Sequence, residues 1–151
     1  MSPPSALRRC PGCGTRNRVP PRHLADTGSC GSCGAELPPL DAPLDVEEPL
    51  FDAIVSQATV PVLVDFWAGW CAPCRAAAPA VARAARECAG RGLVLKVDTE
   101  RCTELAARFD VSSIPCFALL AGGRELERRL GVRPAEELVA LLLAAGEGAG
   151  R

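Results

Sequence analysis

The sequence predicts an α/β protein with a mixed central sheet flanked by helices, preceded by a small four-cysteine domain of the zinc-ribbon type. Short apolar runs rich in β-branched residues alternate with helical segments from about residue 44 to residue 145. Before them stand two close cysteine pairs, in a segment with few large aliphatic residues. A chain of 151 residues, of which 48% are hydrophobic, can hold one ordinary domain and a small appendage.

Four segments are expected along the chain. Residues 1–37 form an N-terminal metal-binding domain, 38–43 a linker rich in proline and acid, 44–145 the α/β domain and 146–151 a flexible tail. The formal net charge of −1 gives no electrostatic case for binding nucleic acid or an anionic membrane. The N-terminus has no apolar stretch of signal-peptide length, and no apolar run approaches the roughly 18 residues that span a bilayer. We therefore expect a cytoplasmic protein without a membrane partner.

The N-terminal domain is predicted from the spacing C-x2-C-x16-C-x2-C. Its cysteines, Cys10, Cys13, Cys30 and Cys33, match a site for one Zn²⁺, and metal ligation supplies folding free energy to a segment with little core. Two disulfides are the alternative, which a reducing compartment disfavours. His23 lies between the pairs and is interpreted as a solvated loop residue, because four cysteines already complete a tetrahedral site. Several arginines surround the pairs, but no aromatic residues interleave them, so nucleic acid is not an expected partner.

The elements of the α/β domain follow from periodicity and turn residues. Apolar runs at 61–68 and 93–97 are typical of strands covered on both faces. Gly122-Gly123 favours a hairpin, whose second strand is charged like a sheet edge. The expected order is an edge strand at 44–46, a helix over 49–57, a strand over 61–68, a helix over 75–89, a strand over 93–97, a helix over 103–109, hairpin strands over 114–120 and 124–130, and a helix over 134–145.

The candidate redox centre is Cys71-Ala72-Pro73-Cys74, between the strand over 61–68 and the following helix. A helix N-terminus offers unpaired N–H groups and a partial positive charge, which stabilise the thiolate that acts in disulfide exchange. Pro73 stiffens the loop where a helix tolerates proline. We interpret the pair as a dithiol/disulfide centre, in which Cys71 attacks from an exposed loop and Cys74 resolves from inside the helix. Half of a metal site is the alternative, but no later pair has matching spacing.

Asp65 is a carboxylate inside an apolar strand. Its neighbours are strongly apolar, so we predict that it is buried and that its pKa is raised, which makes it a functional candidate. Lys96, the only lysine, stands near the end of the next predicted strand. Of the other cysteines, Cys88 is expected to be a small buried residue on its helix, and Cys102 an unpaired thiol open to oxidation.

The order of elements and several motifs resemble the thioredoxin family, and so imply the thioredoxin fold. The cysteine pairs at the N-terminus are similar to those of its zinc-containing bacterial members. The most specific matching segments are Val64–Ala68, Trp70–Cys74, Lys96–Asp98, Ser113–Pro115 and Gly131.

The resemblance implies a thiol–disulfide oxidoreductase that reduces disulfides of oxidised cytosolic proteins. The implied electron donor is an NADPH-dependent thioredoxin reductase, the chain would be a monomer, and it would bind one Zn²⁺ and no organic cofactor. Asp65 would help to deprotonate Cys74 through water, with Lys96 modulating it. Trp70 would pack beside Cys71, and Pro115 would be a cis-proline against the disulfide.

Three residues depart from the family pattern. Ala72 replaces a glycine and leaves the reduction potential open, and Gly69 replaces a proline. Cys116 replaces a threonine, either as a small strand residue, which we favour, or as a third thiol beside the redox pair.

A disulfide oxidant or isomerase is one rival function, which alanine rather than histidine beside Pro73 and the lack of a signal peptide disfavour. A zinc-dependent adaptor or redox sensor is another, which the intact cysteine pair disfavours.

Overall fold

The fold is built on apolar strands whose successive side chains face opposite sides of one sheet. The structure, a computed structural model, describes residues 3–149. Five strands form the sheet in the order β5-β7-β6-β8-β9. They are β5 (Leu44–Asp45), β6 (Val62–Trp67), β7 (Leu93–Asp98), β8 (Cys116–Ala121) and β9 (Arg124–Leu130). Strands β5, β7 and β6 are parallel, and β8 and β9 run antiparallel to their neighbours, so the prediction of a mixed sheet is confirmed.

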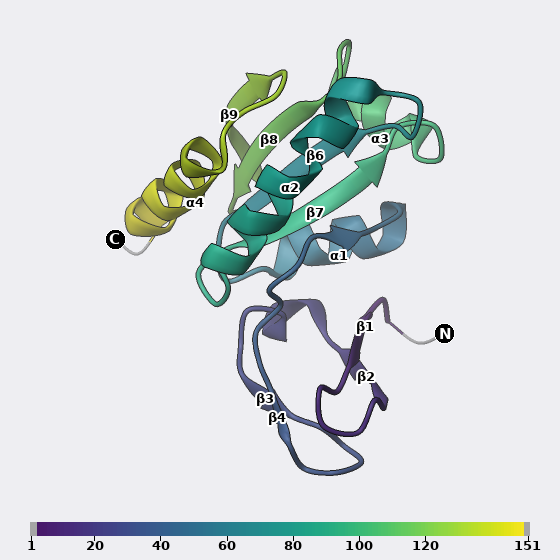
Figure 1. The fold of residues 1–151 in the computed structure, drawn as a ribbon, viewed down its shortest axis with the longest axis vertical. Coiled ribbons are helices and arrows are strands. Elements are labelled where there is room, and N and C mark those ends of the chain that lie inside the picture. The colour runs from purple at the N-terminus through teal and green to yellow at the C-terminus, as the bar shows by residue number, and fades with distance from the viewer. Residues whose placement is uncertain (1–2, 150–151) are drawn as a thin grey trace.

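Helices cover both faces of this sheet (Figure 1). Helices α1 (Glu48–Gln57) and α3 (Thr103–Arg108) pack on the face that carries Val64 and Phe66, and α2 (Ala72–Glu87) and α4 (Ala135–Ala149) pack on the face that carries Leu63. Alternation along β6 sends its even-numbered residues toward α1 and its odd-numbered ones toward α2. Within residues 3–149, no helix is both long enough and apolar enough to cross a membrane.

The largest difference from the predicted elements is at the C-terminal end. Helix α4 extends to Ala149, so residues 146–149, expected in the tail, are helical. Gly146 lies against Pro61, where an added Cβ would be 3.8 Å from the proline Cγ. This packing offsets the low helix propensity of glycine. Residues 150–151 of the predicted tail lie outside the described part of the chain.

The N-terminal segment consists of two antiparallel hairpins. The first pairs β1 (Ala6–Arg9) with β2 (Arg16–Val19), and the second pairs β3 (Gly28–Ser29) with β4 (Glu36–Leu37). A short 3₁₀ helix, η1 (Pro21–His23), lies between them. Each hairpin turn ends on a glycine with positive φ, 77° at Gly14 and 76° at Gly34, a conformation that glycine adopts without a Cβ penalty. We refer to residues 6–37 as the ribbon.

The ribbon packs beside α1 and shares its apolar core (Figure 1). Leu24 and Ala6 are buried in the same cluster as Phe51 and Ile54 of α1. Leu40, in the predicted linker, is also buried there, and its N–H donates to the Leu24 carbonyl at 2.9 Å. The core of the α/β domain therefore continues into the ribbon.

Candidate functional site

The two candidate redox cysteines lie where the segment after β6 enters α2. Cys71 is the N-cap residue of α2, and its sulfur accepts a hydrogen bond from the Cys74 N–H at 3.2 Å. Their Cα atoms are 5.3 Å apart, and the two sulfurs form a disulfide. The Cys71 sulfur thus lies at the positive end of the helix dipole, where a thiolate is stabilised once the disulfide is reduced.

Both cysteines are buried in this oxidised form, with Cys71 3% exposed and Cys74 5% exposed. The loop itself is exposed, as predicted, at Trp70 and Pro73, but the prediction of an exposed Cys71 side chain is wrong for this oxidised form, because Ala68, Trp67 and Ile114 pack around the pair. The two residues differ instead in their access to a surface cavity of about 420 Å³. Cys71 is part of its wall and Cys74 is not, so a substrate in this cavity meets Cys71.

Trp70 forms one side of the same cavity. Its side chain is 67% exposed, and its indole N–H donates to Oε1 of Glu100 at 2.8 Å. Trp70 and Cys71 therefore line one opening, together with Pro73. Sequence reasoning did not identify Glu100, which reaches Trp70 only because the loop after β7 lies beside the loop after β6.

The loop before β8 borders the disulfide from the other side. The Ile114–Pro115 peptide bond is cis, as the resemblance implies. The Cys71 sulfur lies 3.8 Å from the Ile114 carbonyl oxygen. The N–H of Gly131 donates to the Pro115 carbonyl at 2.9 Å, which ties the loop to the end of β9.

Cys116, directly after Pro115, does not join the redox pair. It is fully buried in the core beneath α1 and α3, whereas Cys71 and Cys74 belong to a separate cluster. Burial also raises the pKa of the Cys116 thiol. These observations favour the interpretation of Cys116 as a small strand residue.

Asp65 is buried on the face of the sheet covered by α2, the helix that carries Cys74. It is 2% exposed, and its Oδ1 has no hydrogen-bond partner among the described residues. Burial raises the pKa of Asp65 from 3.8 to about 7, Lys96 opposes this shift and Asp45 adds to it. The prediction of a buried carboxyl group with a raised pKa is confirmed. Its part in catalysis stays a prediction.

Lys96 lies directly beside Asp65 on the adjacent strand β7. Its ammonium nitrogen is 4.3 Å from the centroid of the Trp67 ring, so it makes a cation–π contact. Trp67 was missed as a candidate site residue. Its odd-numbered position on β6, two residues after Asp65, is the pattern that could have identified it.

The remaining cysteines of the α/β domain are buried thiols. Cys88 is fully buried, which confirms its prediction. Cys102 is 8% exposed, its thiol lies 3.8 Å from the Val46 carbonyl, and burial raises its pKa. Cys102 is thus more buried than expected, because the segment at the end of β5 packs against it, although it also lines a cavity of about 830 Å³. Its oxidation stays a prediction.

The four cysteines of the ribbon converge on one point. Their sulfurs all lie within 4.8 Å of one another. The Cys10 and Cys33 sulfurs are 3.6 Å apart, and those of Cys13 and Cys30 are 3.7 Å apart. Backbone N–H groups of Gly12 and Ser32 donate to the sulfurs of Cys10 and Cys30, at 3.3 Å and 3.4 Å.

This arrangement fits a tetrahedral Zn²⁺ site. Zinc–sulfur bonds of about 2.3 Å place ligand sulfurs about 3.8 Å apart, close to the observed separations. A disulfide needs about 2.05 Å, so the pairing into two disulfides does not fit. His23 is not part of the cluster; its exposed ring lies 2.8 Å from Asp26, as expected of a solvated loop residue.

Comparisons with known proteins agree with both parts of the chain. The family model Thioredoxin matches residues 42–144, and the model Thioredoxin 2, N-terminal, matches residues 9–35. Thioredoxin C-3 of Corynebacterium nephridii is 39% identical over 129 residues, which covers 85% of this chain and 88% of the relative. Thioredoxin 1 of Chlorobaculum tepidum is 39% identical over 87 residues, 58% of this chain and 86% of the relative.

Solved structures agree as well. A mutant thioredoxin from Halobacterium salinarum superimposes with a TM-score of 0.65 at 30% identity, over 70% of this chain and 92% of that chain.

Proposed function

Since the chain belongs to the thioredoxin family, we propose that Cys71 is the attacking thiol and Cys74 the resolving thiol of a reductase of protein disulfides. The chain is a thiol–disulfide oxidoreductase with an N-terminal zinc-binding domain. One observation carries the assignment of roles: Cys71 caps α2 and lines the surface cavity, whereas its disulfide partner Cys74 does not reach that cavity.

The reaction proceeds in two exchange steps. The Cys71 thiolate attacks one sulfur of a substrate disulfide, which forms a mixed disulfide and releases the other substrate sulfur as a thiolate that takes up a proton. The Cys74 thiolate then attacks the Cys71 sulfur and releases the second substrate thiol. Two electrons have passed to the substrate, and the Cys71–Cys74 disulfide remains.

Asp65 is proposed to handle the proton of Cys74 through water. With its pKa raised to about 7, the carboxyl group is close to half ionised at neutral pH, so it can both accept and return a proton. Lys96 modulates this group by its positive charge. Trp70 and Pro73 line the cavity in which the substrate chain would be held, and the buried cis-proline Pro115 follows Ile114, which also lines it.

The electron donor is proposed from the family. Thioredoxins generally receive electrons from thioredoxin reductase and reduce protein disulfides. For this chain we propose an NADPH-dependent reductase as the donor and oxidised cytosolic proteins as substrates, with the chain acting as a cytoplasmic monomer. We also propose that residues 1–37 act as the metal-binding domain and residues 44–145 as the redox domain.

Zinc has a structural role in this proposal. Cys10, Cys13, Cys30 and Cys33 would hold one ion, which supplies folding free energy to a ribbon with little core of its own. The exchange steps belong to Cys71 and Cys74 alone.

The two roles can be tested by insulin reduction and by trapping. Cys71→Ser should abolish insulin reduction, whereas Cys74→Ser should still attack but accumulate mixed disulfides on Cys71. Non-reducing gels and mass spectrometry detect these adducts. A Cys74→Ser/Cys116→Ser variant should trap the same adducts, because Cys116 is buried away from the pair.

The roles are reversed if Cys71→Ser traps substrates through Cys74 and neither Cys74 variant does. A wild-type chain that binds partners without reducing insulin would instead favour the adaptor function.

A further inference from the structure

Three charged residues lie in one row across the parallel part of the sheet. The strand register places Asp45 of β5 opposite Lys96 of β7, and Lys96 opposite Asp65 of β6. Residues in register on neighbouring strands project from the same face. Exposure falls along the row, because Asp45 is exposed, Lys96 is half-buried and Asp65 is 2% exposed. The single lysine of the chain therefore stands between an outer and an inner carboxylate.

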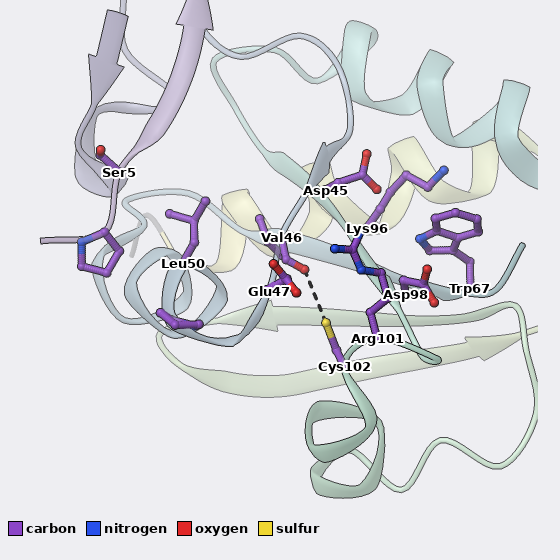
Figure 2. A pocket seen from close by; sticks show the side chains of 12 residues that line it. Ser5, Asp45, Val46, Glu47, Leu50, Trp67, Lys96, Asp98, Arg101 and Cys102 are labelled. Atoms are coloured by element: carbon purple, nitrogen blue, oxygen red, sulfur yellow. Dashed lines mark hydrogen bonds between the residues drawn. The ribbon is translucent and has the colours of Figure 1, made fainter.

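The outer half of the row borders a cavity of about 830 Å³ at the junction with the N-terminal segment. Figure 2 shows Asp45 beside the Lys96 side chain and Trp67 on the other side of it. Among the described residues, Lys96 makes no ion pair within 4.0 Å of either carboxylate, and its ammonium lies over the Trp67 ring. The lysine charge is thus not committed to an ion pair with either acid.

We propose that Asp45 is a positioning residue for the redox reaction, which acts on Asp65 across Lys96. Its negative charge attracts the ammonium outward and also repels a charge on Asp65. Both effects favour the protonated form of the buried carboxyl group. The inference deepens the proposed function, because it concerns the residue that would serve Cys74.

Other groups around Asp65 do not replace this effect. Helix α2 contributes the redox pair itself, which does not titrate while it is a disulfide. Strand β8 places the uncharged Phe117 opposite Asp65, and the Cys116 thiol faces the opposite side of the sheet. Lys96 and Asp45 are the charged residues whose fields act on the Asp65 pKa, Lys96 lowering it and Asp45 raising it.

The expected size follows from the sheet spacing. Two strand spacings separate Asp45 from Asp65, roughly 10 Å. At that distance one charge shifts a titration midpoint by roughly 0.3 to 1.2 pH units, for effective dielectric constants between about 80 and 20. Asp45→Asn should therefore lower the Asp65 midpoint by this amount.

The experiment follows the ¹³C NMR titration of the Asp65 carboxyl carbon in the oxidised, zinc-loaded full chain, where Cys71 and Cys74 do not titrate. Glu47→Gln is the matched control, since it removes one negative charge from the wall of the same cavity but lies outside the row. Asp45→Asn should lower the midpoint and Glu47→Gln should leave it in place. Lys96→Met should raise it, which shows that the signal responds to the row.

The pH profile of insulin reduction is measured for the same variants. Its acidic limb should move with the NMR midpoint in Asp45→Asn and stay in place in Glu47→Gln. An unmoved Asp65 midpoint in Asp45→Asn, or an equal shift in Glu47→Gln, would overturn the inference even if insulin is reduced normally. If the wild type does not reduce insulin, the proposed function fails, and the NMR titration still decides whether Asp45 acts on Asp65.

Discussion

Replacing Asp65 with asparagine should stabilise the folded protein above neutral pH and leave its stability near pH 4 almost unchanged. The carboxyl group is 2% exposed, and its pKa rises from 3.8 to about 7 mainly through burial. In the unfolded chain the group ionises freely near pH 4, whereas the folded protein keeps the proton until about pH 7. The folded state therefore binds more protons between these values, and wild-type stability falls as the pH rises through this window.

The size of the effect follows from the two pKa values. A difference from 3.8 to about 7 corresponds to about 4 kcal/mol at 1.36 kcal/mol per pH unit, reached in full above pH 7. Asparagine keeps the shape of the side chain and carries no charge, so it removes this cost. We expect Asp65→Asn to gain up to about 4 kcal/mol at pH 8 and less than about 1 kcal/mol at pH 4.

Urea denaturation of the oxidised, zinc-loaded proteins at several pH values measures this difference. Other titrating groups, the ribbon thiols included, are common to both chains and cancel in the comparison. Glu104→Gln is the control, because Glu104 is exposed. The difference in free energy of unfolding between this variant and wild type should not grow from pH 4 to pH 8 as it does for Asp65→Asn. A stability difference between Asp65→Asn and wild type that is equal at pH 4 and pH 8 would refute the argument from burial.

Two further predictions concern the ribbon. Metal analysis should find about one zinc per chain, and the Cys30→Ser variant should lose this metal. Cys30→Ser should also lower the unfolding midpoint reported by Trp67 and Trp70, because the ribbon shares the core of the redox domain. An unchanged midpoint would contradict the shared core. Leu24→Ala should lower the free energy of unfolding by about 2 to 5 kcal/mol while the zinc content stays at one per chain. Urea denaturation and metal analysis measure the two quantities. An unchanged free energy of unfolding would show that Leu24 is not a core residue of the whole molecule.

Local sequence patterns were enough to predict most of the sheet and its helices. The continuous apolar runs of β6 and β7 and the glycine pair before β9 are signals that tertiary packing reinforces. The end of α4 was not predictable in the same way. Gly146 has a low helix propensity, and its packing against Pro61, which is distant in sequence, leaves no signal in the local pattern.

A site residue was predictable where its type and the few residues around it in the sequence are enough to indicate its chemistry. The ribbon cysteines, the redox pair and the buried Asp65 are of this kind. Burial of Cys71 and the contact between Trp70 and Glu100 were not, because both depend on loops that meet only in the folded chain. Asp45 was missed for a related reason: β5 has two residues, too few to show a period, and its register with β7 is a tertiary property.

The continuous core between the ribbon and α1 decides how the chain can be shortened. A fragment beginning at residue 44 would keep every residue of the redox pair and its surroundings. It would lose Ala6, Leu24 and Leu40, and so would present to water the surface of α1 that these side chains cover. An uncovered apolar patch of this kind promotes self-association. Poor solubility of such a fragment would then result from the missing packing partner of α1. It would not result from loss of zinc, because the fragment contains no metal site.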